Sequence, residues 1–384
     1  MAKKGSLIVV GSGIKSVGHI TIEARGWIAE ADIVLYLVAD PATAIWIRHT
    51  NANCIDLSTY YDDAKARLDT YREITDEILR HVRKGLDVCA VFYGHPGVFA
   101  RSPHEAIRSA RAEGFRAAML PAVSALDCLF ADLGVDPAYP GCQMFEATDF
   151  LVCRRQINTA CHVILWQIGF VGDPGHSSAG YDGHNLPILI EELQKIYGRD
   201  YEVVHYQAAQ YPVCPPLIQR LPLSALQPDM VSSASTLYIP PMEPSASDPA
   251  MAHRLGLHTW PDGRAMQTPS PYRPVAENSR LAQLLHDLSC NPRLLARYHR
   301  DPEATISLYG GLSEEERDAI LSRAHNRIGS AMLAQPEPAP ASDTYGLPNP
   351  KRRLPPRSQA VQQSEVRQFT RGEEVELACN QAQR

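Results

Sequence analysis

The strongest constraint on the fold is the alternation of short β-branched runs with helical segments over residues 5–132. Strands are predicted at SLIVVG, DIVLYLVAD, DVCAVFYG and RAAMLP, with helices after Gly18, over 62–84 and from Ser102. This alternation is typical of an α/β lobe with a largely parallel sheet. Ligands of such sheets bind at the loops that follow the strands, so the site is expected there.

A second α/β lobe is predicted after residue 135. Its strand-like runs are CHVILWQI, YEVVHYQ and ASTLYIPP, and its apolar helix LPILIEELQKIYG ends at Gly198 as a C-cap. The polar stretch GDPGHSSAGYDGHN predicts a long loop. We therefore expect a two-lobed domain over 1–242, with lobes at about 1–135 and 136–242.

Three further segments are predicted from changes in composition. Residues 243–276, rich in Pro, Ser and Asp, predict a linker, and residues 277–333 predict a small helical module. Residues 334–384 are rich in Pro, Gln, Arg and Glu with few large apolar side chains, which predicts a disordered tail.

The helical module carries clear helix-start signals. Asn291 and Asp301 each precede a proline, as N-caps do, and Ser313 begins a capping box that starts a last helix running toward Met332. Leucines recur on one helical face, which predicts the core of the module rather than a partner-binding face, at positions 281, 284, 285 and 288.

Charge and hydropathy give no indication of a nucleic-acid or membrane partner. The 384 residues are 45% hydrophobic and 21% charged, which is typical of a globular protein. The net charge of −6 favours neither nucleic acid nor an anionic membrane as a partner. The short basic run PKRRLPPR at 350–357 is interpreted as a solvated tail segment. No stretch of about 18 apolar residues follows the strand-like amino terminus, so we expect a soluble, cytoplasmic protein.

Cysteine spacing predicts neither disulfides nor a zinc site. The nine cysteines are odd in number and never spaced C-x-x-C, so we interpret them as reduced thiols. His176 and His184 flank Asp182 in the polar loop, but their spacing fits no common metal pattern, and no metal is expected. The cysteines lie at positions 54, 89, 128, 142, 153, 161, 214, 290 and 379.

A glycine turn follows the first predicted strand. Gly11 and Gly13 in VVGSGIKSVG stand where a nucleotide could approach, and Asp40 could imitate the acid that binds a ribose. Ser16 replaces the third glycine of the dinucleotide fingerprint, so a tight strand-to-helix turn is at least as good an interpretation. The motif alone therefore gives weak support for NAD.

Two later strand ends are also candidates. YGHPGVF, at 93–99, must turn sharply and expose backbone groups to a cleft. In LPAVSALDCLF, Ser124 starts a helix, and its hydroxyl could cap that helix or contact a ligand, with capping favoured by the spacing.

These three stretches, in this order, resemble the glycine turn, the G-D-P loop and the P-G-x-S loop of the tetrapyrrole (corrin and porphyrin) methylase fold. That fold binds S-adenosylmethionine between two α/β lobes, and LWQIG, HYQAAQYP and STLYIPP stand where it has its second-lobe contacts. The resemblance implies a cofactor site at Gly11, Gly13, Tyr93, His95, Val98, Phe99, Ser124, Ala125, Gln167, Tyr206 and Thr236.

The chain departs from the tetrapyrrole enzymes at both glycine loops. Where those enzymes continue the first loop as Pro-Gly-Asp, Ile14, Lys15 and Ser16 stand here, and their G-D-P reads Gly94, His95 and Pro96. These departures argue against a porphyrin-type substrate.

A second resemblance is to the borosin family of peptide backbone α-N-methyltransferases, which share this fold. Their hallmark is a tyrosine, an arginine six residues on, a tyrosine four later and another that opens YGHPGVF, here Tyr61, Arg67, Tyr71 and Tyr93. The segment LLHDLSCNPRLLARYHRDPEATISLYGGLSEEERDAIL also resembles the binding domain of borosin precursor peptides.

This resemblance implies chemistry on a peptide amide without a metal. An amide nitrogen is a poor nucleophile because its lone pair is delocalised into the carbonyl. Arg67 would stabilise charge growing on the amide oxygen and lower the pKa of a neighbouring phenol. We assign Tyr71 as the base by hypothesis, with Tyr61 and Tyr93 positioning the peptide.

Four functions remain open. The first is a fused borosin enzyme, in a homodimer, that methylates its own tail. The others are a methyltransferase for a separate peptide, a catalytically silent interaction protein of this fold and a tetrapyrrole-type small-molecule methylase. The tail is not strongly apolar, and its prolines lack an amide hydrogen, which leaves candidate acceptors in ASDTYGL and SEVRQFTRGEEVELACNQ.

Overall fold

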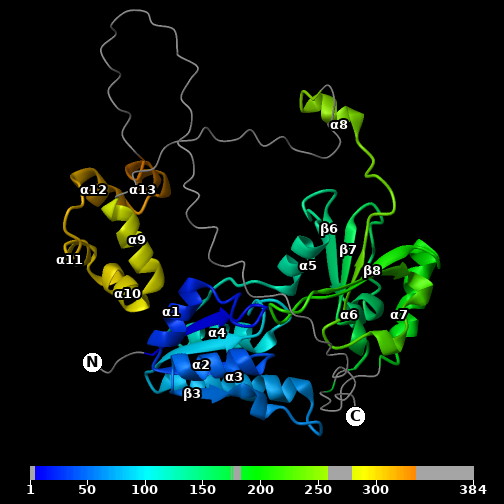
Figure 1. The fold of residues 1–384 in the computed structure, drawn as a ribbon, viewed down its shortest axis with the longest axis horizontal. Helices are drawn as coiled ribbons and strands as arrows, with labels where there is room; N and C mark the ends of the chain where they lie inside the picture. Colours follow the sequence, from blue (N-terminus) through cyan, green and yellow to red (C-terminus); the bar gives the residue numbers. More distant parts are fainter. Residues whose placement is uncertain (1–4, 174, 176–182, 258–278, 334–384) are drawn as a thin grey trace, which may run out of the picture. The chain divides into compact units, whose positions relative to one another are not determined.

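The computed structural model describes residues 5–173, 175, 183–257 and 279–333 (Figure 1). His176, Asp182, most of the predicted linker and the predicted tail therefore lie outside the described residues. Within the described ranges, no helix combines the length and the apolarity needed to cross a membrane.

The first lobe contains a five-stranded parallel sheet in the order β3-β2-β4-β1-β5. Its β-branched runs are buried on both faces, as is usual for a parallel sheet covered by helices, so the predicted α/β class is confirmed. The strands are β1 (Ser6–Gly11), β2 (Ile33–Leu37), β3 (Cys54–Asp56), β4 (Asp87–Phe92) and β5 (Arg116–Met119).

Helices cover both faces of this sheet. Along β1, Leu7 and Val9 pack in one core cluster while Ile8 and Val10 pack in another, because successive side chains point to opposite faces. The first cluster lies under α3 (Arg67–Arg83) and α4 (Arg101–Ala112), and the second under α1 (Ile22–Glu30) and α2 (Pro41–Thr50). A 3-10 turn, η1 (Leu57–Tyr60), follows β3.

The predicted start of α3 near Asp62 is wrong. The Asp62 carboxylate accepts from Ala64 N at 2.9 Å and closes a local turn, while Ala66 stays extended as the N-cap residue. Asp side chains stabilise such turns as readily as helix starts. The helix consequently begins at Arg67 itself and carries Tyr71 one turn later.

The second lobe contains a five-stranded mixed sheet in the order β6-β7-β10-β8-β9, in which only β6 and β7 are parallel. The edge strands β6 and β9 are not in the prediction, because they are only partly buried and show no clear apolar alternation. The strands are β6 (Cys142–Glu146), β7 (His162–Trp166), β8 (Glu202–Gln207), β9 (Leu217–Pro222) and β10 (Thr236–Ile239).

This second sheet is also covered on both faces, as Figure 1 shows. On one face lies α5 (Ala125–Leu133), and on the other lie α6 (Ala147–Val152) and α7 (Leu186–Tyr197), which ends at Gly198 as predicted. Short 3-10 turns connect the elements at η2 (Ile168–Phe170), η3 (Leu223–Ala225) and η4 (Pro228–Met230).

The helical segment near the carboxyl end has its own core, in which Leu281, Leu284 and Leu288 are buried as the leucine pattern predicts. The Asn291, Asp301 and Ser313 caps form as predicted. The helices are α9 (Arg280–Cys290), α10 (Pro292–Arg300), α11 (Pro302–Ile306), α12 (Glu314–Ser322) and α13 (His325–Ala331), after an isolated α8 (Pro249–Arg254).

The single last helix predicted toward Met332 is instead two helices. Arg323 adopts φ 53° and ends α12 in a left-handed conformation, and its guanidinium lies 5.9 Å from the centre of the Tyr298 ring. No glycine or proline marks this break in the sequence. The proposed domain boundaries themselves remain predictions.

Candidate active site

A cavity of about 370 Å³ lies between the two lobes, where strands of both sheets end. The first lobe contributes residues that end or follow β2 and β4, and the second contributes residues from β7, β8 and the turn before β10. Ligands bind at such strand ends in open α/β sheets, and this volume is within the range of small-molecule sites.

The structure brings most of the predicted site residues to this cavity. Exceptions are Gly11, Gly13 and Arg67, which do not line it. The predicted residues that line it are Tyr61, Tyr71, Tyr93, His95, Val98, Phe99, Ser124, Ala125, Gln167, Tyr206 and Thr236.

The two glycines of the first loop serve close backbone packing. A Cβ on Gly11 would lie 2.1 Å from the Gly94 carbonyl oxygen, and Gly13 adopts φ 70° while its N–H donates to that same oxygen at 3.2 Å. Asp40 is buried as the N-cap of α2, where it accepts from the Ser16 hydroxyl at 2.7 Å. The geometry therefore favours the strand-to-helix turn over a dinucleotide fingerprint.

The YGHPGVF segment forms part of the cavity wall. Gly94 has φ 66° and Phe99 φ 52°, and the His95 imidazole accepts from Gly97 N at 3.0 Å, which closes the turn. The Phe99 ring lies 5.5 Å from the ring of Trp166, so this segment reaches the second lobe. Val98 and Phe99 are exposed within the cavity, as a binding surface requires.

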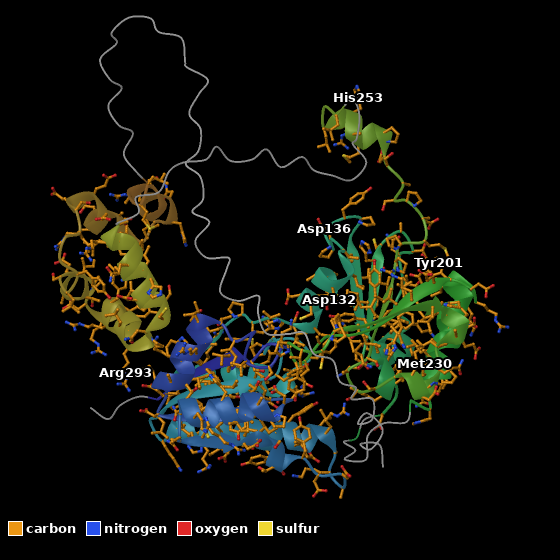
Figure 2. All side chains as sticks on the ribbon, in the orientation of Figure 1. Asp132, Asp136, Tyr201, Met230, His253 and Arg293 are labelled. Atoms are coloured by element: carbon orange, nitrogen blue, oxygen red, sulfur yellow. The ribbon has the colours of Figure 1, made fainter. Side chains whose placement is uncertain are left out.

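Two cavity tyrosines are held in the protonated form. Desolvation raises the pKa of Tyr93 to about 12, although the residue as a whole is 41% exposed. Burial, and a hydrogen bond in which the Tyr206 hydroxyl donates to Asp132 at 2.7 Å, raise the pKa of Tyr206 (Asp132 is labelled in Figure 2). Both phenols are therefore hydrogen-bond donors at neutral pH rather than bases.

Ser124 is the N-cap of α5, as the spacing predicts. Its hydroxyl and the Asp127 carboxylate form a capping box, with Ser124 Oγ donating to Asp127 Oδ2 at 2.7 Å. Because Ser124 and Ala125 both line the cavity, the amino-terminal turn of α5 faces it. The partial positive charge of a helix start suits an anionic ligand group.

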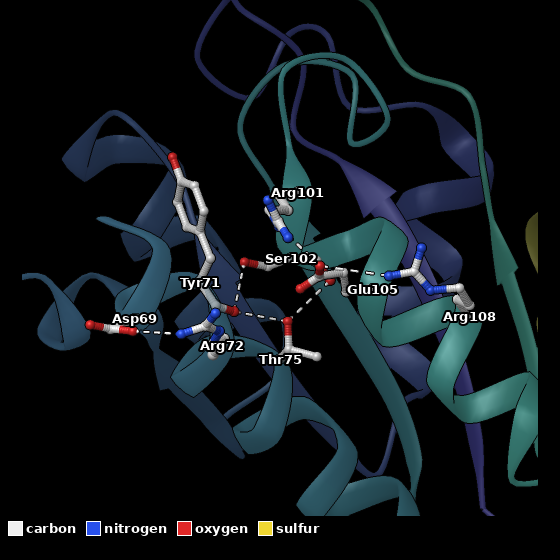
Figure 3. A network of polar contacts seen from close by, with 8 residues as sticks. All are labelled: Asp69, Tyr71, Arg72, Thr75, Arg101, Ser102, Glu105 and Arg108. Carbon is white, nitrogen blue, oxygen red and sulfur yellow. Dashed lines mark hydrogen bonds and ion pairs between the residues drawn. The ribbon is translucent and has the colours of Figure 1, made fainter. Parts of the chain in front are cut away.

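The backbone of Tyr71 is fixed by α4, whereas its phenol is directed elsewhere. The Tyr71 carbonyl accepts from Ser102 Oγ at 3.1 Å and from Thr75 Oγ1 at 2.8 Å. Figure 3 shows the ring pointing away from this network. Tyr61 and Tyr71 both line the cavity, so the two phenols lie at one site.

Arg67 contacts the second lobe instead of the cavity. Its guanidinium donates to the Gly175 carbonyl oxygen and lies 5.3 Å from the centre of the Phe170 ring, and Ala66 pairs with Gly175 as an isolated antiparallel bridge. The sequence spacing correctly places Arg67 one helical turn before Tyr71 but carries no signal for this contact.

The predicted site residue Gln167 has φ 60°, a left-handed conformation that costs a non-glycine residue about 1–2 kcal/mol and places it at the cavity. Several other lining residues are not among the predicted site residues. The additional lining residues are Ile14, Leu37, Phe92, Gly94, Ala100, Arg101, Ser102, Pro103, Trp166, Ala208, Ser233, Ala234 and Ser235. In the described part of the chain, no group of three or more His, Cys, Asp or Glu could hold a metal ion.

The fold and this cavity define a methyltransferase of the tetrapyrrole methylase class. The family model for tetrapyrrole (corrin/porphyrin) methylases matches residues 6–212, and that for the borosin biosynthesis clasp domain matches residues 264–346. Among solved structures, uroporphyrin-III-C-methyltransferase from Thermus thermophilus aligns at 17% identity and TM-score 0.46, covering 62% of this chain and 93% of that one.

Curated relatives combine a methyltransferase and a peptide precursor in one chain. A methyltransferase fused to a ribosomally synthesised type I borosin cyclic peptide precursor, from Coprinopsis marcescibilis, is 41% identical over 86% of this chain and 93% of its own length. The corresponding omphalotin A precursor fusion from Omphalotus olearius is 38% identical over 83% and 85%. The chain therefore belongs to the family of borosin methyltransferase–precursor fusions.

Proposed function

We propose that this enzyme transfers methyl groups from S-adenosylmethionine to backbone amide nitrogens of its own tail, residues 334–384. The observation that carries the proposal is the combination, in one chain, of an interlobe methylase cavity lined by Tyr61, Tyr71 and Tyr93 with a clasp-domain match. Its relatives are named as fusions of a methyltransferase with a peptide precursor, and this chain covers 85–93% of the two described above.

The cavity residues fit S-adenosylmethionine. Phe92, Val98 and Trp166 supply apolar walls suited to a purine, while Gln167 and Thr236 supply polar groups for the ribose and amino acid parts. The start of α5 suits the carboxylate. When bound, this cofactor supplies an electrophilic methyl group, so no metal is required.

Arg67 is proposed to bind the carbonyl oxygen of the acceptor residue. Methylation requires the amide to develop imidate character, which places negative charge on that oxygen. The contact with Gly175 supports this role, since the guanidinium there donates to a peptide carbonyl, the same chemical group that an acceptor presents. The carbonyl oxygen of the acceptor residue would replace that of Gly175 as the hydrogen-bond partner of the Arg67 guanidinium.

Tyr71 is proposed to take the amide proton. The phenol of Tyr93 is a poor candidate for the base because its pKa is raised to about 12 by burial. Tyr93 and Tyr61 would instead orient the peptide by hydrogen bonding. Hydrogen bonds to the Tyr71 carbonyl fix the backbone from which its phenol reaches the cavity.

The acceptors are proposed to lie in ASDTYGL or in SEVRQFTRGEEVELACNQ, because the prolines of the tail carry no amide proton. The enzyme would act as a homodimer in which the clasp segment holds the peptide. A separate precursor peptide remains the alternative substrate, since the tail is not strongly apolar.

Tandem mass spectrometry of residues 334–384 tests this function. Protein expressed alone should carry whole-methyl mass increments on backbone positions, and an Arg67→Ala, Tyr71→Phe double variant should carry none. A tail without methyl groups in a protein that binds S-adenosylmethionine would assign the substrate to another chain. Failure to bind the cofactor would overturn the proposal and favour an interaction role.

A further inference from the structure

A buried polar network supports the second-lobe wall of the cavity from behind. We infer that His205, on β8, is a positioning residue that fixes the turn at residues 232–236, which forms part of that wall. His205 is fully buried and does not line the cavity, whereas Ser233, Ala234, Ser235 and Thr236 do. The inference rests on the proposed function in one respect, namely that this cavity holds S-adenosylmethionine.

The donors and acceptors in this network determine which atom carries each proton. Ser235 Oγ accepts from Ser232 N at 2.8 Å and from Gln207 Nε2 at 3.0 Å, which uses both of its lone pairs. Its only proton is therefore directed to the remaining partner, His205 Nε2, at 2.8 Å. The imidazole consequently carries its own proton on Nδ1, which donates to Gln219 Oε1 at 2.8 Å.

The neutral imidazole fits this position. Burial lowers the pKa of His205, although the hydrogen bond to Gln219 acts in the opposite direction. The neutral ring is the form that can accept from Ser235 while donating to Gln219. The histidine thus links the exposed edge strand β9 to the buried hydroxyl that orders the turn.

The turn is also constrained on its other side. It is closed by Ser235 N donating to the Ser232 carbonyl at 3.0 Å. A Cβ on Gly169 would lie 2.1 Å from that carbonyl oxygen, so the chain just after Gln167 packs directly against the turn. The turn therefore sits between the His205 network and the segment that presents Gln167 to the cavity, and a shift of either changes the wall.

Loss of the imidazole would leave the Ser235 hydroxyl without its acceptor. The hydroxyl would then rotate toward another partner and release Ser232 N or Gln207 from their bonds. We expect a His205→Leu variant to bind S-adenosylhomocysteine about tenfold more weakly, the effect of losing one buried hydrogen bond and its alignment. His205→Gln, which can both accept and donate, should stay within about threefold of the wild-type Kd.

His162 provides a matched control. It is buried in the same sheet, on β7, bonds to the Tyr238 hydroxyl at 2.7 Å and does not line the cavity. His162→Leu should lower the melting temperature as His205→Leu does, but should leave the affinity for S-adenosylhomocysteine unchanged. A role limited to stability would give both variants the same affinity.

The experiment is calorimetric titration of the full chain with S-adenosylhomocysteine, together with thermal melts of the same samples. The inference requires weaker binding in His205→Leu, recovery in His205→Gln and no change in His162→Leu. If His205→Leu does not fold, Gln219→Leu, at an exposed position of the edge strand β9, removes the partner that orients the ring, and it should weaken binding about threefold.

The outcomes separate this inference from the proposed function. Unchanged affinity in His205→Leu, or in Gln219→Leu where that variant is used, overturns the positioning role while the proposed function stands. Equal weakening in His205→Leu and His162→Leu also overturns it, because the effect would be general to the sheet. A wild-type chain that binds no S-adenosylhomocysteine overturns the proposed function and this inference with it.

Discussion

At the scale of single residues, the tyrosines of the cavity differ in their surroundings. Tyr93 and Tyr206 lie in environments that keep the phenol protonated. Tyr71 is held through its backbone and presents its phenol at the same cavity. Chemically identical side chains can therefore serve as hydrogen-bond donors at one position, while the proposed role of Tyr71 as a base at another is a separate prediction.

Replacing Tyr71 by phenylalanine should lower the rate of tail methylation about a hundredfold or more, because general-base catalysis contributes at least that much. Affinity for S-adenosylhomocysteine should change little. The measurement is a single-turnover time course followed by intact-protein mass spectrometry. Tyr139→Phe, at a surface tyrosine outside the cavity lining, is the control. An unchanged rate in Tyr71→Phe would remove Tyr71 from the base role.

The pKa of Tyr93 predicts a loss of stability in alkali. Its value of about 12 in the folded protein exceeds that of an unfolded tyrosine, about 10, so the folded state retains a proton that the unfolded state loses. The contribution is present below about pH 10 and falls as pH rises toward about 12.

Denaturant unfolding across this range should therefore show a smaller pH dependence in Tyr93→Phe than in wild type. Ultraviolet titration of the phenolates in folded protein should lose one of the components that titrate near pH 12 in the same variant. If Tyr93→Phe follows the wild-type pH dependence throughout, the raised pKa is not a property of Tyr93.

At the scale of elements, the contact between α3 and α4 decides where Tyr71 lies. Ser102 is buried at the start of α4 and donates to the Tyr71 carbonyl, and Thr75 donates to the same oxygen from one turn farther along α3. The Ser102 bond holds the first turn of α3 against α4, while the Thr75 bond lies within α3, as Figure 3 shows.

Ser102→Ala should cost about 1 kcal/mol of unfolding free energy, the usual worth of a buried hydrogen bond. It should also lower kcat for tail methylation several-fold, because the first turn of α3 is less constrained. Ser109→Ala, in the same helix and away from the cavity, controls for the substitution itself. Equal kcat values in the two variants would show that Ser102 does not position Tyr71.

Local signals in the sequence predict helices best where the capping residue is unambiguous. Asn291, Asp301, Ser313 and Ser124 all cap helices as predicted, because their side chains satisfy free backbone N–H groups. The helix start predicted near Asp62 is wrong, because the Asp62 carboxylate closes a turn instead of capping a helix. The helix α2 is absent from the prediction although Asp40 and Pro41 give it the same kind of start.

At the scale of the whole molecule, the site is assembled from segments far apart in the sequence. The two-lobed α/β class could be predicted because the alternation of strands and helices is visible as a pattern, and 11 of the 24 residues that line the cavity could be predicted from the family resemblance. The turn at 232–236 and the contact between Arg67 and Gly175 could not, since both depend on tertiary packing without a local signature.

The helical segment near the carboxyl end is expected to present the tail to the enzyme. Leu284 is fully buried in its core, so Leu284→Asp should unfold this segment. Tail methylation should fall about a hundredfold as the effective concentration of the peptide drops, while cofactor affinity stays unchanged.

The control for this change is Leu308→Asp, at a leucine that is 55% exposed, which should leave both the fold and methylation intact. Far-ultraviolet circular dichroism checks the loss of helix in the same samples. Full methylation of the tail in unfolded Leu284→Asp would show that the segment has no part in presenting the substrate.

Self-methylation is tested most directly by transfer of an isotopically labelled methyl group in vitro. Unmodified full-length protein, made with S-adenosylmethionine depleted, would be incubated with S-adenosylmethionine carrying a deuterated methyl group, and the tail fragmented by tandem mass spectrometry. We predict labelled methyl groups on backbone nitrogens within residues 334–384, and none in Tyr71→Phe. A tail without label in protein that has bound the cofactor would contradict self-methylation.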